Sequence, residues 1–420
     1  MLRLLRSLAL AAAAWLTAAN LAFAAGADPP GAPSDPGRQV LVLLKTPPPH
    51  LGPGADYGSA YGEGPARIAQ RRIASRLARR HGLTMASDWP LPLLGLDCFV
   101  MTAPPGMSAK AAAAALSAEP AVAWAEPMSL YRAQAAPPPS QARLYLAEPA
   151  AREWSLAALQ RIATGRGVRV AVIDSAVERD HPDLAGQVAI QKDFVTDRPA
   201  SSEEHGTAVA GVIAAKGLGV AGIAPGARLL ALRACWQVPS KDPDAPATYC
   251  DSLSLAKALH YAISARAQVI NMSLAGPPDP LLGRLIDLAR SRGAVVVGAY
   301  DPALAGGGFP ANHDGVVAVA DETARGLPRG VLGAPGRDVP TTEPGGRWYL
   351  VSGNSFAAAH VSGLLALIKQ RAPQAHGAAA LATTTPHGRT IDACASLLKA
   401  SAPCDCSCPH PGQEAAVARR

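Results

Sequence analysis

Five short runs of residues that are apolar on both faces recur in the part of the chain after residue 160. They lie at 168–174, 228–234, 268–274, 294–299 and 316–320. Strands with one solvent-exposed face alternate apolar and polar residues, whereas strands that are buried on both faces are apolar throughout. Helical segments separate or follow the runs and begin near Gly206, Ser252, Pro280 and Ser355. The pattern predicts an α/β domain with a doubly wound, mostly parallel sheet, whose functional residues lie at the carboxyl ends of the strands.

A different pattern precedes this domain. Strand-like runs at 39–45, 84–90, 98–103 and 121–125 alternate with helical segments at 65–82 and 108–117. The order β-α-β-β-α-β is that of a small ferredoxin-like α+β domain. Pro137, Pro138 and Pro139 follow it, and such a segment packs neither as helix nor as sheet. We therefore expect an α+β domain at 38–130, a proline-rich linker at 131–150 and the α/β domain at 151–400.

The first 24 residues have the features of a secretory signal peptide. Arg3 and Arg6 precede an apolar stretch at 8–21, and Ala22-Phe23-Ala24 ends it. This arrangement predicts export with cleavage after Ala24, and therefore a secreted or periplasmic product. No later run approaches the roughly 20 apolar residues that a membrane helix needs. We expect no stable membrane span once the signal is removed.

Seven cysteines in an exported chain permit disulfides. Cys235 and Cys250 bracket a polar, proline-rich stretch and are the expected pair. The C-terminal tail, 401–420, holds Cys404, Cys406 and Cys408, whose spacing fits no standard zinc knuckle. We expect oxidised cysteines there rather than a metal site.

Composition argues against a nucleic-acid partner. Aromatic residues make up 5% of the chain and do not alternate with basic clusters, as a base-stacking surface would require. The net charge of +7 is spread along the chain, and more than half of it lies before residue 141. The charge therefore gives no reason to expect a polyanionic partner.

Three polar residues stand where such an α/β domain carries its function. Asp174 ends the strand V-R-V-A-V-I-D, His205 opens H-G-T-A-V-A-G, and Ser355 opens S-F-A-A-A-H-V-S-G. Each alone is typical of a turn or a helix cap. Together they supply a nucleophile, a base and an orienting carboxylate, which acyl transfer needs because a serine hydroxyl is a weak nucleophile until an imidazole takes its proton.

The chain order Asp, His, Ser distinguishes between families of serine hydrolases. His205 follows Asp174 by 31 residues, and Ser355 follows His205 by 150. This is the subtilisin order, whereas α/β-hydrolases run Ser, acid, His and chymotrypsin-like enzymes run His, Asp, Ser. No G-x-S-x-G surrounds Ser355 and no H-E-x-x-H occurs, which excludes esterase and zincin motifs.

Longer motifs resemble the subtilisin-like serine protease family between about Trp154 and Arg371. They are V-A-V-I-D-S-A-V with H-P-D-L, H-G-T-A-V-A-G, G-V-A-G-I-A-P-G-A-R-L, V-I-N-M-S-L-A-G and S-G-N-S-F-A-A-A-H-V-S-G. The resemblance implies a serine endopeptidase with Asp174, His205 and Ser355 as its triad. It also implies that the α+β domain is a propeptide that inhibits the enzyme and aids its folding, and a permanent N-terminal module is the alternative. Its tail, from Glu126 onward, would lie in the cleft until it is cut between Tyr131 and Ala150.

The resemblance also implies a peptide-binding edge and an oxyanion hole. Extended polypeptide substrates would pair with an edge strand formed by Ser273, Leu274, Ala275 and Gly276. The family's oxyanion asparagine is missing, because Tyr300 and Asp301 stand where it is expected. Asn354, next to the serine, is the candidate replacement donor, and a simple polar replacement is the alternative. Glu203 and Glu204 are expected to be solvated surface charges.

Two functions remain open at this stage. The first is a secreted serine endopeptidase made as an autoprocessed preproenzyme, acting on extended polypeptides and needing no cofactor for its chemistry. The second is a catalytically impaired, subtilase-like protein that binds peptides, because the oxyanion asparagine is missing. Calcium sites are common in the family, but no acidic loop here identifies one.

Overall fold

The computed structural model describes residues 36–46, 65–133, 149–196, 198–200, 203–238, 247–385 and 388–401. The expected signal peptide, nearly all of the linker and the cysteine-bearing tail lie outside the described residues. Among the described residues, no helix is long and apolar enough to cross a membrane.

A four-stranded antiparallel sheet forms the N-terminal α+β domain, with strand order β2-β3-β1-β4. Its elements are β1 (Gln39–Lys45), α2 (Pro65–Arg80), β2 (Thr84–Leu91), β3 (Leu96–Thr102), α3 (Ala109–Ser117) and β4 (Val122–Pro127), and the short helices η1 (Pro36–Arg38) and η2 (Pro92–Leu94) flank β1 and β3. Ser108 caps α3 by accepting a hydrogen bond from the Ala111 N–H at 3.1 Å. The expected β-α-β-β-α-β order is confirmed.

A seven-stranded sheet forms the larger domain, with strand order β15-β14-β13-β11-β6-β8-β7 and every neighbouring pair parallel. The strands are β6 (Arg169–Asp174), β7 (Val188–Asp193), β8 (Arg228–Arg233), β11 (Val269–Met272), β13 (Val295–Ala299), β14 (Val317–Asp321) and β15 (Leu332–Ala334). Strand order reverses beside β6, between β8 and β11. Ligand sites of open α/β sheets lie at such a reversal, at the carboxyl ends of the strands.

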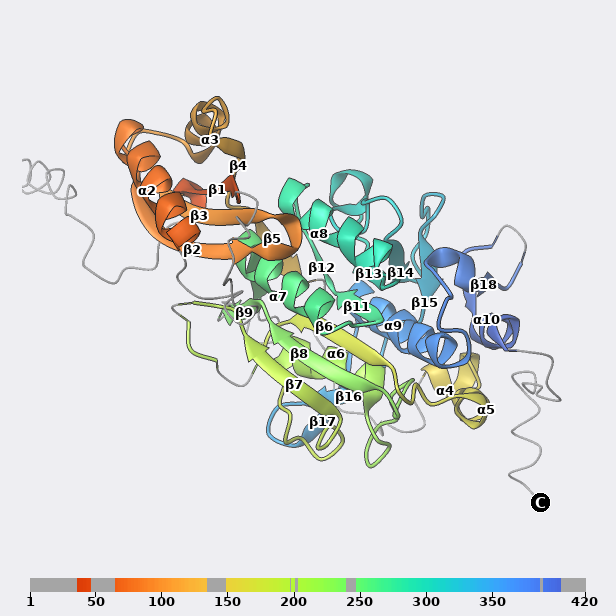
Figure 1. The fold of residues 1–420 in the computed structure, drawn as a ribbon. Helices are drawn as coiled ribbons and strands as arrows, with labels where there is room; N and C mark the ends of the chain where they lie inside the picture. The colour runs from red at the N-terminus through yellow and green to blue at the C-terminus, as the bar shows by residue number, and fades with distance from the viewer. Residues whose placement is uncertain are drawn as a thin grey trace, which may run out of the picture. The chain divides into compact units, whose positions relative to one another are not determined.

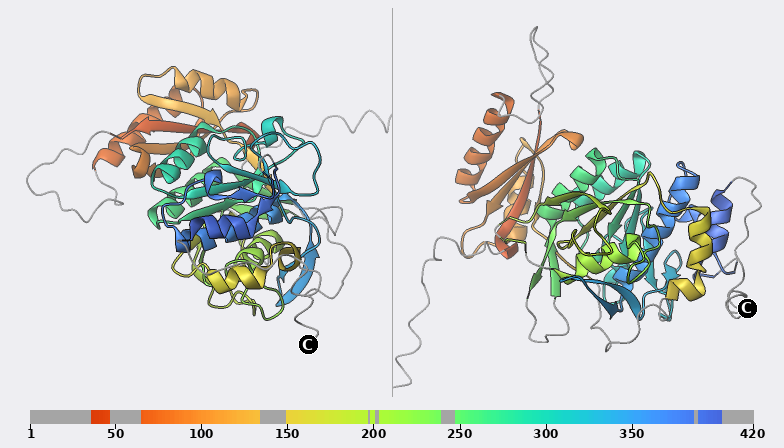
Figure 2. Two further views of the ribbon diagram at one scale, coloured as in Figure 1. Left: turned by 90° about the vertical axis from the view of Figure 1, so that its right-hand side faces the viewer. Right: turned by 90° about the horizontal axis from the view of Figure 1, so that it is seen from below.

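Helices cover both faces of this sheet (Figures 1 and 2). Val170 and Val172 pack with α6 (Glu204–Ala214) and α9 (Asn354–Arg371), whereas Ala171 and Ile173 pack with α7 (Ser252–Ser264) and α8 (Pro280–Ser291). Both faces are buried, which is why these strands read as continuous apolar runs. The remaining described elements are α4 (Pro149–Glu153), α5 (Leu156–Ile162), η4 (Ala305–Gly307), β16 (Val339–Glu343), β17 (Arg347–Val351), η5 (Ala378–Ala380), β18 (Ala382–Thr383), β19 (Ile391–Asp392) and α10 (Ala393–Ala400).

A small third sheet, with order β12-β5-β10-β9, joins the two domains. Its strands are β5 (Leu130–Ala133), β9 (Cys235–Val238), β10 (Ala247–Asp251) and β12 (Leu274–Ala275). Residues 131–133 were expected to begin a linker without regular structure, and this is wrong for them. They form a strand because β10 and β12 offer backbone partners on both sides.

A disulfide joins the two strands at the outer side of this sheet. Cys235 of β9 lies directly opposite Cys250 of β10, and the two sulfur atoms are bonded. The expected pairing is confirmed. The bond ties β10, which is the neighbour of β5, to the body of the larger domain.

Glu203 is buried rather than solvated, which corrects the expectation for it. Its side chain is 2% exposed and receives two hydrogen bonds from the Arg233 guanidinium, at 3.0 and 2.8 Å. It also accepts the backbone N–H of Ala176. Asp193 completes the charge balance around Arg233, at 3.0 Å. The pair connects the end of β8 to the residue that precedes α6.

Replacing Arg233 with Met should destabilise the protein strongly, because Glu203 would keep a buried charge without its partner. Breaking a buried pair from one side costs about 3–5 kcal/mol. Urea unfolding, in a Ser355→Ala background that prevents self-digestion, measures the change. Arg347→Met is the matched control, since Arg347 is 68% exposed in its pair with Glu343 and should contribute below about 1 kcal/mol. Equal effects of the two changes would contradict this reading.

Asp183 anchors the loop between α6 and β8. Its carboxylate accepts backbone N–H groups from Leu218, Gly219 and Val220 at 2.6–3.1 Å, and the Trp348 indole N–H at 2.7 Å. Burial alone would raise the pKa of Asp183, but these donors outweigh it and hold the pKa below its ordinary value.

Stability should therefore depend on the ionisation of Asp183. Its contribution is complete above the unfolded-state pKa of about 3.9, and it is lost as the pH falls through the lower folded-state pKa. An Asp183→Asn variant should be less stable than the parent at pH 7, and the gap should narrow below pH 4. Thermal unfolding across this pH range measures the gap. A gap that does not change with pH would show that the charge is not involved.

Candidate active site

Asp174 and His205 are in direct contact at the carboxyl end of β6. The His205 Nδ1 atom lies 2.8 Å from the Asp174 Oδ1 atom, and both residues are at least 94% buried. A carboxylate is an acceptor only, so Nδ1 carries the proton and the Nε2 atom presents a lone pair. The Ser175 N–H also donates to Asp174 Oδ1, at 2.7 Å, and fixes the carboxylate. The pair is therefore arranged as an oriented base.

The close approach of α6 to the end of β6 depends on Gly206. A Cβ at this position would lie 2.3 Å from the backbone oxygen of Ser175. The Gly206 N–H instead donates to the Ser175 Oγ atom at 3.0 Å. The glycine that follows His205 is therefore required by packing, and it places the imidazole against Asp174.

Ser355 lies in the first turn of α9 and is fully buried. Its hydroxyl donates to the backbone oxygen of Ser273 at 3.0 Å. Within the described part of the chain, the His205 Nε2 atom has no hydrogen-bond partner. The His205 ring packs against Phe356, the next residue after Ser355, with 5.7 Å between ring centroids. The structure thus brings all three triad residues together but does not join the serine hydroxyl to the imidazole.

A buried network of polar side chains holds the backbone of Ser355. The Ser273 Oγ atom donates to the Ser355 carbonyl at 2.9 Å and accepts from Asn271 Nδ2 at 2.9 Å, and the Ser362 hydroxyl donates to Asn271 Oδ1 at 2.8 Å. The sequence analysis did not single out Asn271 or Ser362. The sequence motifs V-I-N-M-S and A-H-V-S-G could have identified them, because Asn271 stands two residues before Ser273 and Ser362 stands seven residues after Ser355 in the chain.

The two oxyanion candidates are both engaged with backbone groups. Asn354 Nδ2 donates to the Tyr300 carbonyl at 2.6 Å, and Asn354 Oδ1 accepts the Asp321 N–H at 2.8 Å. Asp301 accepts the Ala303 N–H at 2.9 Å. Asn354 therefore braces the ends of β13 and β14 against α9. Its role as an oxyanion donor stays a prediction.

The four expected substrate-binding residues lie together along the small third sheet. Leu274 and Ala275 form β12, and they pair with Ala133 and Arg132 of β5 in antiparallel register. Gly276 continues toward Phe309, with which it exchanges two backbone hydrogen bonds at 2.9 and 2.8 Å. Ser273 joins this edge to Ser355, as described above. The edge is occupied in this chain by residues of its own N-terminal part.

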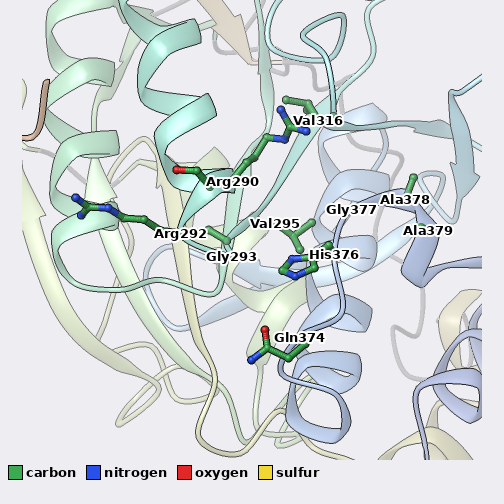
Figure 3. Close-up of a pocket in the computed structure, with 13 residues that line it drawn as sticks. Arg290, Arg292, Gly293, Val295, Val316, Gln374, His376, Gly377, Ala378 and Ala379 are labelled. Atoms are coloured by element: carbon green, nitrogen blue, oxygen red, sulfur yellow. The ribbon is translucent and has the colours of Figure 1, made fainter.

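A cavity of about 710 Å³ lies at the amino ends of the parallel strands (Figure 3). It is beside Val295, the first residue of β13, whereas Asp174 is the last residue of β6 and so lies at the carboxyl ends of the strands. The figure shows Arg290 extending toward Val316 and Arg292 pointing away from His376. The residues that line this cavity do not include Asp174, His205 or Ser355, nor any of the four expected substrate-binding residues. Among the described residues, no cluster of three or more His, Cys, Asp and Glu side chains could hold a metal ion.

Comparison with known proteins agrees with this geometry. The model of the Subtilase family matches residues 165–390. An intracellular serine protease of Paenibacillus polymyxa is 35% identical over 231 residues, which cover 50% of this chain and 68% of that protein. Subtilisin E of Bacillus subtilis is 35% identical over 230 residues, which cover 50% of this chain and 57% of that protein.

A solved structure shows the same fold. Fervidolysin from Fervidobacterium pennivorans, described as a keratinolytic enzyme related to subtilisin, matches with a TM-score of 0.61 and 22% identity. The match covers 86% of this chain and 61% of fervidolysin. The family model spans more than half of the chain, and the matched residues include Asp174, His205 and Ser355, the three residues predicted to form the triad. The chain therefore belongs to the subtilase family and is a subtilisin-like serine endopeptidase.

Proposed function

We propose that this chain is exported as a preproenzyme, cuts itself after its N-terminal α+β domain, and then hydrolyses extended polypeptides outside the cytoplasm. The observation that carries the proposal is the position of β5. This strand belongs to the N-terminal part of the chain, yet it lies between β10 and β12 of the larger domain. A substrate would have to occupy the same place to reach Ser355.

The pairing of β5 has the geometry of a bound peptide. Tyr131 and Arg132 pair with Cys250 and Tyr249 on one side, and Arg132 pairs with Ala275 on the other. Backbone hydrogen bonds from both sides bind an extended chain without regard to its sequence, and side-chain pockets add specificity. We infer that β5 is the tail of a propeptide that occupies the substrate cleft.

The register of β5 indicates which bond is cut. Leu274 lies opposite Ala133, so an antiparallel ladder continued by one residue would set Ser273 against residue 134. Ser273 is the residue whose carbonyl accepts the Ser355 hydroxyl. Gln134 itself lies outside the described residues. We propose that Ser355 attacks the carbonyl of Gln134, which makes Ala135 the first residue of the product.

The rest of the α+β domain supports an inhibitory role. Leu41, Leu43 and Val100 of its sheet share one apolar core with α7 and α8 of the larger domain. The Arg284 guanidinium of α8 lies over the Trp124 ring, 4.0 Å from its centroid. Burying apolar surface stabilises a contact by about 25 cal/mol per Å². The shared core therefore holds the α+β domain against the larger domain, and β5, which follows that domain in the chain, stays in the cleft.

The proposed chemistry follows from the arrangement of the three side chains. Rotation of the Ser355 side chain would exchange its bond to Ser273 for one to the His205 Nε2 atom. The Ser355 Oγ atom then bonds to the scissile carbonyl carbon while His205 takes its proton. His205 passes this proton to the leaving amine, and water releases the acyl group by the same steps. Asp174 keeps the imidazole oriented, and no metal or cofactor is required for this mechanism.

Stabilisation of the oxyanion is expected to be weaker than in relatives that have an asparagine donor. We propose that the Ser355 N–H and the N-terminus of the 18-residue helix α9 provide most of it. In subtilisin itself, loss of one oxyanion donor lowers turnover about 100- to 1000-fold. The proposed enzyme should therefore be slow, but still fast enough to cut itself once.

Self-cleavage should depend on Ser355. The parent chain should yield a product that begins at Ala135, because the register places the adjoining carbonyl at the serine, whereas Ser355→Ala should remain uncut. Intact mass and N-terminal sequencing of the exported protein measure both outcomes, and Ser291→Ala, at an exposed serine near the end of α8, is the matched control that should still be cut. An uncut parent chain that also fails to react with a fluorophosphonate probe would favour a peptide-binding protein instead.

Asp174→Asn should lower kcat by about 10⁴ with little change in KM, because an amide at this position favours the wrong imidazole tautomer. Peptide hydrolysis by the processed enzyme measures the effect. Asp180→Asn, a change at a side chain that is 93% exposed, should leave kcat unchanged. A similar kcat for Asp174→Asn and the parent enzyme would exclude the proposed triad.

A further inference from the structure

The Tyr131 side chain fills a closed pocket of the larger domain. It is 1% exposed, and its ring lies where a Cβ on Gly276 would be, 2.3 Å from the Tyr131 Cδ1 atom. Phe309 flanks the ring with 6.3 Å between centroids. The glycine makes room for the flat face of an aromatic ring, and the neighbouring ring makes the walls apolar.

The base of this pocket is polar. The Tyr131 hydroxyl donates to Asp279 Oδ2 at 3.1 Å, and the Ser252 hydroxyl donates to the same oxygen at 2.6 Å. Asp279 Oδ1 caps α8 by accepting the Leu282 N–H at 2.9 Å. Asp279 is 4% exposed and Ser252 is fully buried. The carboxylate is therefore fixed in position and turned toward the end of the ring.

Electrostatics keep the phenol as the donor and Asp279 as the acceptor. Burial, followed by the charge of Asp279, raises the pKa of Tyr131 above its ordinary value, so the hydroxyl stays protonated. Burial, followed by the same charge, raises the pKa of Glu126 to about 8. Glu126 is thus mainly neutral at pH 7. Because Glu126 belongs to the α+β domain, it leaves the pocket when that domain does.

We propose that Asp279 is a specificity-determining residue that selects tyrosine at the fourth position before the cleaved bond of a substrate. The assignment rests on the proposed function, since Tyr131 is the fourth residue before the bond after Gln134. Ser252 and Gly276 complete the pocket. The propeptide tail already presents the side chain that the pocket fits.

Tyrosine and phenylalanine differ here by one hydrogen bond to a buried charge. Phenylalanine would fill the apolar walls equally well, but it would leave Asp279 Oδ2 with one donor fewer in a place that excludes water. A net bond to a charged group contributes about 1.5–3 kcal/mol. This corresponds to a preference for tyrosine of about 10- to 100-fold in kcat/KM.

Peptides that contain Tyr-Arg-Ala-Gln before the cleaved bond test the assignment. Variants of the peptide carry Phe, Ala or Lys in place of Tyr, and the enzyme is the processed product of the full-length chain. We expect the parent enzyme to prefer Tyr over Phe at least 10-fold. Asp279→Asn should reduce this preference below about 3-fold, because the amide still caps α8 but presents no charge to the phenol. Asp287→Asn, the same change on the outer face of α8, should keep the full preference.

The outcomes separate this assignment from the proposed function. Cleavage of the Ala peptide, together with fluorophosphonate labelling, reports that each variant is folded and active. Equal rates for the Tyr and Phe peptides in an active parent enzyme would overturn the role of Asp279, as would a Tyr preference that survives in Asp279→Asn. A faster rate for the Lys peptide would assign the carboxylate to a cation instead. Failure of all peptides, with no labelling, would count against the proposed function.

Discussion

The parallel order of the seven-stranded sheet is the constraint on which the site depends. Because all seven strands run in the same direction, their carboxyl ends meet at one edge, and the reversal of strand order beside β6 leaves space there. Asp174 ends β6, and Ser273 follows β11, its neighbour. Helices α6 and α9 both begin at this edge and bring in His205 and Ser355. Residues separated by 181 positions in the chain thus share one small volume.

Two buried polar pairs stabilise this edge of the sheet, although burying their charged groups has a cost in desolvation free energy. The Arg233–Glu203 pair and the Asp174–His205 pair lie at the ends of adjacent strands, β8 and β6. Removing charges from water is unfavourable unless each finds partners, and here backbone N–H groups of Ser175 and Ala176 supply additional ones. The turn after β6 is therefore held by both carboxylates. We infer that Glu203 acts indirectly, by fixing the residues that position the imidazole.

Much of the fold was predictable because its signals are local. The apolar runs identified five of the seven parallel strands, and chain order with short motifs pointed to Asp174, His205 and Ser355, three residues that the folded sheet brings to one place. Strand β5 was missed because four residues become a strand only when β10 and β12 flank them. Glu203 was misjudged because Arg233, its partner, is 30 residues away and nothing between them indicates the contact. The hydrogen bonds of Asn354 likewise depend on Tyr300 and Asp321, which only the folded sheet brings near.

The disulfide between Cys235 and Cys250 has a consequence for the cleft that the proposed release of β5 would open. Strands β10 and β12 would then face each other across a gap one strand wide, about 9–10 Å between their backbones given the usual strand spacing. Without support such facing edges would tend to close on each other, but β10 is covalently fixed to β9 on its far side. The vacancy admits a single extended backbone and is too narrow for a helix. Proteins would therefore become substrates where local unfolding exposes several consecutive residues.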